Sequence, residues 1–157
     1  MSKLETTFWN RIDDVQAGLL DADGERPVPM SPKADAKEKT IYFITAAGSS
    51  ADRAAKSGGE ARFQVADPKA NLYANIVGRL DESGDKERLD AMWSAMAAAW
   101  FEKGRDDPAI RLVKFTPHEG EVWATDSAAG FLYEIAKANV TDSLPDTGEH
   151  GRIAFRA

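Results

Sequence analysis

Short runs in which apolar residues alternate with polar ones fill much of the chain, and this alternation is typical of half-buried β-strands. Residues 27–33 include three prolines, which cannot donate to a ladder, so we expect an edge strand or an irregular one there. About six short strands with few helices between them predict a mainly β fold, an antiparallel β-barrel with flanking helices. The other runs predicted to be strands cover residues 15–21, 40–45, 61–66, 72–80, 112–116 and 121–125.

Turn signals and helical spacing divide these runs. Asp23-Gly24 predicts a hairpin turn because glycine tolerates a positive φ, and residues 117–120 are expected to turn between the last two strands. A first helix is expected at residues 8–12, with Thr6 or Thr7 as its N-cap. Further helices are expected at residues 48–56, 85–100 and 127–138. The helix at 85–100, the third along the chain, has an apolar stripe formed by Leu89, Met92, Trp93, Met96 and Trp100.

Length and composition indicate one domain. The chain has 157 residues, of which 43% are hydrophobic and 29% charged, as in a globular protein with one core. We expect one domain over residues 1–138 and a polar, mobile C-terminal tail over residues 139–157.

Charge and residue usage exclude several function classes. A net charge of −6 argues against binding to nucleic acid or to an anionic membrane. There are no cysteines, and the two histidines are far apart in sequence, so no metal site is expected. The chain carries no apolar leader segment and no run of membrane-spanning length, which predicts a cytoplasmic protein.

The loop at residues 45–53 is a candidate anion site. A glycine and two serines, Ser49 and Ser50, stand at a predicted helix N-terminus, where free N–H groups favour an anion. Arg53 adds positive charge one turn later. The alternative is an ordinary serine N-cap on a solvated helix, and the residues alone leave both open.

Two adjacent aromatics, Trp100 and Phe101, follow the apolar stripe of the third helix. Two neighbouring helix positions cannot both face one core, so this pair suits either packing or a flat ligand, whereas Trp93 in mid-stripe is expected to be core. His118 is interpreted as a surface histidine, because only sequence neighbours in its turn could orient it as a base. The pairs Asp13-Asp14 and Asp106-Asp107 are attributed to turns and helix ends, so no catalytic constellation is predicted.

Seven segments in their order along the chain carry a family resemblance. Together they cover almost the whole sequence: residues 8–20, 28–32, 41–45, 66–68, 77–79, 93–108, and a seventh segment made of residues 115–117 and 121–123. On these segments the chain resembles the general stress protein branch of the pyridoxamine 5′-phosphate oxidase-like, FMN-binding split-barrel family.

The resemblance implies a six-stranded antiparallel split β-barrel that forms a homodimer, with FMN at the subunit interface. It implies that the strands holding Met30, Ser31, Ile44 and Thr45 face the flavin ring and ribityl chain. It places Ser49 and Ser50 at the phosphate. Arg53, or alternatively Arg26 or Lys56, is expected to supply positive charge there. Trp100 and Phe101 would reach the flavin edge.

The chain departs from the family pattern at two positions. Val28 stands where the family usually has arginine, and Ala51 where it often has lysine. Three functions follow as hypotheses: a flavin protein with a weak FMN-dependent oxidoreductase activity, a non-catalytic dimer that binds flavin or another ligand for storage or sensing, and a member that has lost flavin binding.

Overall fold

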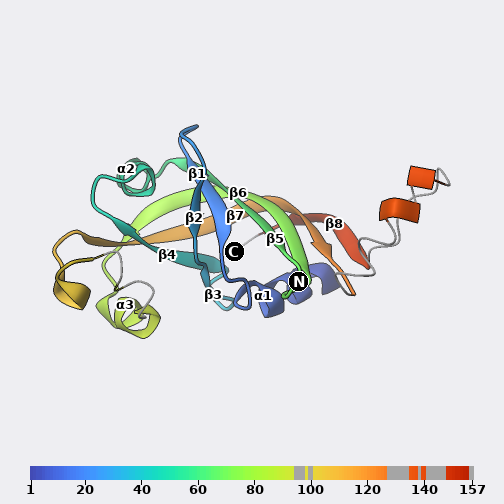
Figure 1. The fold of residues 1–157 in the computed structure, drawn as a ribbon, viewed down its shortest axis with the longest axis horizontal. Coiled ribbons are helices and arrows are strands. Elements are labelled where there is room, and N and C mark those ends of the chain that lie inside the picture. The colour runs from blue at the N-terminus through green and yellow to red at the C-terminus, as the bar shows by residue number, and fades with distance from the viewer. Residues whose placement is uncertain (94–97, 99–100, 127–134, 138, 141–147, 156–157) are drawn as a thin grey trace.

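The computed structural model describes residues 1–93, 98, 101–126, 135–137, 139–140 and 148–155 (Figure 1). In this described part of the chain, a curled sheet is flanked by α1 (Lys3–Ile12), α2 (Ser50–Ser57) and α3 (Lys86–Met92), with a 3-10 turn at Gly104–Asp106. The strands are β1 (Gly18–Ala22), β2 (Val28–Met30), β3 (Lys33–Asp35), β4 (Thr40–Ala46), β5 (Glu60–Asp67), β6 (Leu72–Ser83), β7 (Ile110–Ala124) and β8 (Glu149–Ala154).

Strand β7 organises the sheet because it is 15 residues long and is paired along both edges. On one edge, β6 pairs with residues 112–124. On the other edge, β4 pairs with residues 110–115 and β8 with residues 119–124. The pairings are antiparallel, and the strand order is β2-β1-β5-β6-β7-β4-β3 with β8 beside β7.

The sheet curls until its two edges lie close together. β2 and β3 stand at opposite ends of the strand order, yet only Ser31 and Pro32 separate them in sequence. Three Cα–Cα steps of about 3.8 Å hold Met30 and Lys33 within roughly 11 Å of each other. The predicted mainly β split barrel is therefore confirmed, although the described residues contain eight strands where six were expected.

Phenylalanines fill the barrel. Phe43, Phe63 and Phe115 are fully buried, and the rings of Phe43 and Phe63 meet edge to face at 4.9 Å. Helix α1 adds Phe8 and Ile12 to the same core. Because α1 contacts β3 and β8 while α2 contacts β1 and β4, the two helices cover different parts of the barrel (Figure 1).

Helix α1 begins earlier than predicted, and Thr6 and Thr7 are not its N-cap. The hydroxyl of Ser2 accepts the N–H of Glu5 at 3.1 Å and caps the helix. The Thr6 and Thr7 hydroxyls instead donate to carbonyls one turn back, those of Ser2 and Lys3. A threonine near the start of a helix satisfies its hydroxyl in this way without ending the helix.

The predicted hairpin at residues 117–120 is wrong, because β7 runs through this segment without a turn. Val77 and Gly78 of β6 pair with Glu119 and Pro117, so a β-bulge in β7 with His118 as its extra residue absorbs the irregularity. A Cβ on Gly78 would lie 2.3 Å from the carbonyl oxygen of Thr116 and 2.9 Å from the Cα of Pro117. The glycine therefore provides the space in which a proline-containing strand can continue.

The third predicted helix is shorter than expected. Helix α3 ends at Met92, and Trp93 follows in an extended conformation. Residues 94–97 and 99–100 lie outside the described residues, as does most of the helix predicted at 127–138, of which 135–137 are helical.

The C-terminal segment takes part in the sheet. Residues 149–154 form β8, so the expected mobility is wrong for them, and the division at residue 138 stays a prediction. Ile153 and Phe155, two residues apart, enter the core, and the ring of Phe155 packs 5.3 Å from that of Phe8. The glycines and polar residues around this short apolar alternation obscured it in the sequence.

We expect Gly78→Ala to lower the free energy of unfolding by about 1–3 kcal/mol, because the added methyl group overlaps backbone atoms of β7. Gly84→Ala is the matched control, since nothing lies within 4 Å of its Cβ position, and it should change stability by less than about 0.5 kcal/mol. Urea unfolding of both variants tests this. Equal midpoints for Gly78→Ala and the wild type would contradict it.

Candidate functional site

The end of β4 and the start of α2 bring two predicted site residues together. The hydroxyls of Thr45 and Ser49 lie 2.7 Å apart. Ser49 is the N-cap of α2, and its hydroxyl accepts the N–H of Asp52 at 3.1 Å. Asp52 in turn accepts the N–H of Gly48 at 2.8 Å, which completes a reciprocal cap of the capping-box kind. Ser49 is therefore an ordinary N-cap, and its role toward an anion stays a prediction.

Asp52 is a buried charge within this loop. Its side chain is fully buried, with Lys56 Nζ 3.4 Å from Oδ2 and Arg111 Nε 3.8 Å from Oδ1. Within the described part of the chain, Oδ1 has no hydrogen-bond partner. Burial raises the pKa of the Asp52 carboxyl, but the Gly48 N–H, Lys56 and Arg111 together bring that pKa below its ordinary value. Asp52 is thus an ionised carboxylate at neutral pH.

Arg111 is a basic residue of this region that sequence reasoning missed. It stands opposite Thr45 in the β4–β7 register, and its side chain is 38% exposed. Its Nη1 donates to the carbonyl oxygens of Pro108 and Ile110. The sequence shows Arg111 only as one of several charged residues in this strand, and strand pairing alone reveals its neighbour.

Arg53 does not join this group. Its guanidinium binds the carboxylate of Glu25, in the turn after β1, and the carbonyl of Gly48. The side chain is 53% exposed. Ser50, the first residue of α2, is half-buried, and the described structure leaves its predicted contact with a phosphate untested.

Met30 and Ser31 lie at the seam of the barrel, which is the place where its edge strands β2 and β3 come together. Met30 is half-buried against the main core, and Ser31 is exposed in the two-residue link between β2 and β3. Lys33 is paired with Tyr42, and the β3–β4 register ends at this pair, so the predicted approach of Ser31 to Ile44 stays a prediction.

Phe101 belongs to a second apolar cluster on the outer face of β4. Successive side chains of a strand point to opposite faces. Ile41 and Phe43 enter the barrel core, so Tyr42 and Ile44 point to the outer face. Phe101 is only 8% exposed, and its ring lies 5.9 Å from that of half-buried Trp93. Trp100 lies outside the described residues. Further members of this outer cluster are Leu89, Met92, Ala109, Ile110 and Leu112.

A charged network fixes α3 against the outer cluster. The guanidinium of Arg88 lies 4.1 Å over the ring of Tyr42 and binds Asp35 of β3 at 2.9 Å. The N–H of Glu38 and the Arg88 guanidinium hold the pKa of the Asp35 carboxyl below its ordinary value despite some burial. Burial raises the pKa of the Tyr42 hydroxyl, which donates to Glu38 at 3.0 Å.

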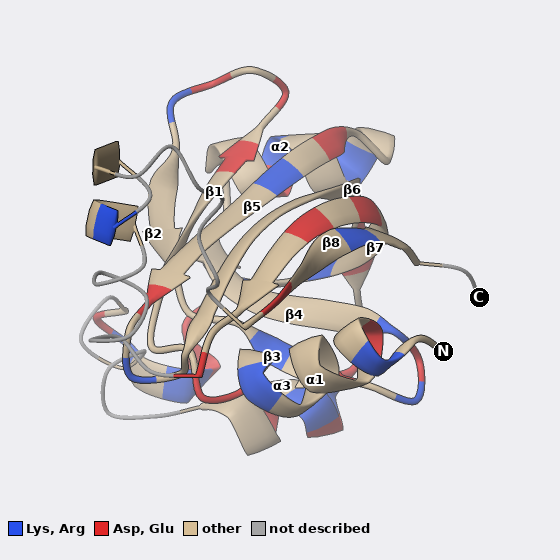
Figure 2. Cartoon of the chain, turned by 90° about the vertical axis from the view of Figure 1, so that its right-hand side faces the viewer, with Lys and Arg blue, Asp and Glu red and all other residues tan. Residues whose placement is uncertain are grey.

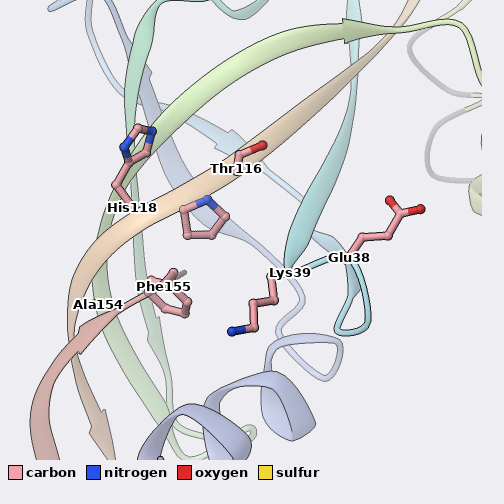
Figure 3. A pocket seen from close by; sticks show the side chains of 7 residues that line it. Glu38, Lys39, Thr116, His118, Ala154 and Phe155 are labelled. Atoms are coloured by element: carbon pink, nitrogen blue, oxygen red, sulfur yellow. The ribbon is translucent and has the colours of Figure 1, made fainter. Parts of the chain in front are cut away.

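A separate cleft of about 370 Å³ lies where the edge of β7 passes from β4 to β8 (Figure 3). The Lys39 ammonium lies 3.3 Å from the buried carboxylate of Glu5. His118 is exposed here, as its interpretation as a surface histidine requires. The predicted flavin-facing residues are not among those that line it, which are Glu38, Lys39, Thr116, Pro117, His118, Ala154 and Phe155.

The surface charge, the possible metal ligands and the length of the helices bear on which kinds of partner the described residues could bind. Figure 2 shows acidic and basic segments interspersed along β5 and β8, so this face carries mixed charge. Among the described residues, no three His, Cys, Asp or Glu side chains gather as a metal site would need. None of the helices in that part of the chain is long and apolar enough to cross a membrane.

Comparison with known proteins places this fold and loop in a family. The family model described as pyridoxamine 5′-phosphate oxidase like matches residues 3–146. The chain belongs to the pyridoxamine 5′-phosphate oxidase-like family. The resemblance found on the seven sequence segments is therefore confirmed. A search of curated proteins gives no match for this family member.

Solved structures agree with this membership. A protein of Jannaschia sp. CCS1 assigned as general stress protein 26 is 44% identical, with a TM-score of 0.82 over 99% of this chain and 100% of that one. A general stress FMN/FAD binding protein of Xanthomonas citri is 24% identical, with a TM-score of 0.68 over 81% and 92%. Because its sequence identity is low, the Xanthomonas citri protein supports the shared fold alone.

We expect Asp52 to make the protein sensitive to acid. Its folded-state pKa lies below the ordinary 3.8, so the carboxylate stabilises the fold above pH 3.8, and this stability is lost as the pH falls through the folded value. Asp52→Asn should lower stability at pH 7 and should flatten the loss of stability below about pH 4. Asp14→Asn, on an exposed residue after α1, is the matched control. Urea unfolding at pH 7 and below about pH 4 measures the free energy of unfolding of each variant. If Asp52→Asn loses as much stability on acidification as the wild type, the prediction is contradicted.

Proposed function

We propose that this chain is a flavin-binding protein of the general stress type, with FMN beside the end of β4. The observation that carries the proposal is the joined pair of hydroxyls of Thr45 and Ser49 at that strand end. Membership of the pyridoxamine 5′-phosphate oxidase-like family supports it, and so does a structural neighbour named for FMN/FAD binding.

The proposed site has a polar part and an apolar part. Thr45 and Ser49 offer hydroxyls to the ribityl chain, and Ser50 lies next along the helix toward the phosphate end. Ile44 and Phe101, in one cluster, suit the flat face or edge of a flavin ring. Following the family resemblance, we also assign Met30, Ser31 and Trp100 to the ring side of the site. The polar part fits the ribityl chain, whereas the buried carboxylate of Asp52 beside it does not suit a phosphate dianion.

The chemistry of the proposed activity would come from the cofactor. FMN, when bound, supplies hydride transfer, and the protein binds and orients it. We therefore propose a weak FMN-dependent oxidoreductase activity. A dimer that holds flavin without catalysis, for storage or sensing, is the alternative, and bleaching of bound flavin by NAD(P)H without oxygen separates the two.

We further propose a homodimer with the flavin at its interface. The outer face of the sheet carries apolar side chains that one subunit leaves in contact with water, among them Leu19, which is 44% exposed. Val77 and Trp123 point to the same face and are half-buried, and Trp123 stacks on His150 at 4.7 Å. A second copy of the chain would cover such a surface.

Thr45→Val tests the flavin site. The change keeps the shape but removes one hydroxyl, so the Kd for FMN should rise about tenfold, the value of one net hydrogen bond. Quenching of FMN fluorescence measures the Kd. Thr116→Val, which removes a hydroxyl in the separate cleft, should leave FMN binding unchanged. A wild-type protein that quenches no FMN would sink the proposal and favour a member that has lost flavin binding.

Light scattering tests the dimer. The wild-type protein should give twice the 17.1 kDa mass of the chain at all micromolar concentrations. Leu19→Glu places a charge on the apolar outer face and should shift the mass toward the monomer. Ala36→Glu adds the same charge in the exposed turn before β4 and should not. A wild-type mass of one chain would contradict the dimer.

A further inference from the structure

The N-terminus of α2 already holds an anion that belongs to the chain. Helix N-termini attract anions because their N–H groups are free and the helix dipole is positive there. In this chain the fully buried carboxylate of Asp52 accepts the N–H of Gly48, and the hydroxyl of Ser49 accepts the N–H of Asp52. Two of the donors that a phosphate would use are therefore taken.

The basic residues around the loop are also engaged by acids. Lys56 and Arg111 lie within 4 Å of the two oxygens of Asp52, and Arg53 binds Glu25. The family's usual arginine and lysine are replaced by Val28 and Ala51, neither of which carries charge. The positive charge of this region is thus directed to carboxylates of the chain itself.

A bound phosphate would have to draw Arg111 or Lys56 away from Asp52. The Oδ1 atom of Asp52 already lacks a hydrogen bond and has Arg111 as its nearest cation. Among the described residues, moving Arg111 would leave the fully buried carboxylate with Lys56 and the Gly48 N–H alone, and moving Lys56 would leave Arg111 as its one remaining cation, so either loss of compensation is costly. A phosphate dianion beside an ionised carboxylate also meets direct repulsion.

We propose that Asp52 is a specificity-determining residue that acts as an internal anion, so that this site binds flavins without selecting for the 5′-phosphate. The inference rests on the flavin site proposed above. Recognition then comes from the ring and the ribityl chain, which riboflavin and FMN share. A phosphate bound by Ser49 and Ser50, as the resemblance implies, with charge from a basic residue such as Arg53, would instead favour FMN strongly.

The test compares the Kd values of FMN and riboflavin by fluorescence quenching. For the wild type, we expect the two values to agree within about tenfold, whereas two charge-assisted bonds to phosphate would separate them by about a hundredfold or more. Raising the salt from about 50 to about 500 mM should not weaken FMN relative to riboflavin, because there is no attractive phosphate contact to screen, and screening of the repulsion by Asp52 can only favour FMN.

Asp52→Asn supplies the decisive variant. Removing the charge releases Lys56 and Arg111, so FMN should gain about tenfold in affinity relative to riboflavin. Glu25→Gln is the matched control, because it removes one carboxylate and releases one arginine, Arg53, on the exposed side of α2. It should leave the ratio unchanged.

Each outcome decides the inference. A wild type that prefers FMN a hundredfold overturns it, and so does a folded Asp52→Asn variant with an unchanged ratio. An equal effect of Glu25→Gln overturns it as well, since general charge would then explain the change. If Asp52→Asn fails to fold, the wild-type ratio and its salt dependence still decide. If neither flavin binds the wild type, the proposed flavin site itself fails, and this inference with it.

Discussion

The rest of the structure depends on the pairing of β7 along both of its edges. A strand of 15 residues is longer than its partners β4 and β8, so they share one edge in succession while β6 follows the other. A one-residue bulge in β7, opposite Val77 and Gly78, lets β6 stay paired with it along this length. The sheet twists and curls around β7, and its edge strands come within the reach of Ser31 and Pro32. The barrel core, the seam and the cleft between β4 and β8 follow from this arrangement.

Strand β4 connects the core to the proposed site because its two faces have different neighbours. Ile41 and Phe43 enter the barrel, while Tyr42 and Ile44 pack with α3 and Phe101 on the outside. Packing on both faces fixes the direction in which the strand ends. The hydroxyl of Thr45 is therefore held where α2 begins, without a flexible loop between the core and the polar group.

Electrostatics at that strand end are set by one buried carboxylate. A charge as buried as Asp52 must be paired, and it draws both the N–H of Gly48 and the two cations Lys56 and Arg111. The same contacts cap α2 and order the loop before it. The same two cations that stabilise the loop by pairing with Asp52 are therefore not free to bind a phosphate. This is the physical basis for the proposed flavin site that does not select for the 5′-phosphate.

The sequence by itself determined the mainly β class and the positions of most strands, because alternation and turn residues are local signals. The family came from a resemblance carried by segments in their order along the chain, and the choice between a serine cap and an anion site at α2 stayed open. The sequence did not reveal that residues 110–124 form one strand, because Pro117 and Gly120 together predict a turn. The strand continues through Pro117 because the facing residue of β6 is Gly78, which has no side chain to clash with it. The sequence could not pair Arg111 with Asp52, or Arg53 with Glu25, because such partners are chosen by strand register and helix packing. Burial of Asp52 was likewise decided only by the tertiary structure, since a helix-terminal aspartate in sequence is equally compatible with solvent and with a closed loop.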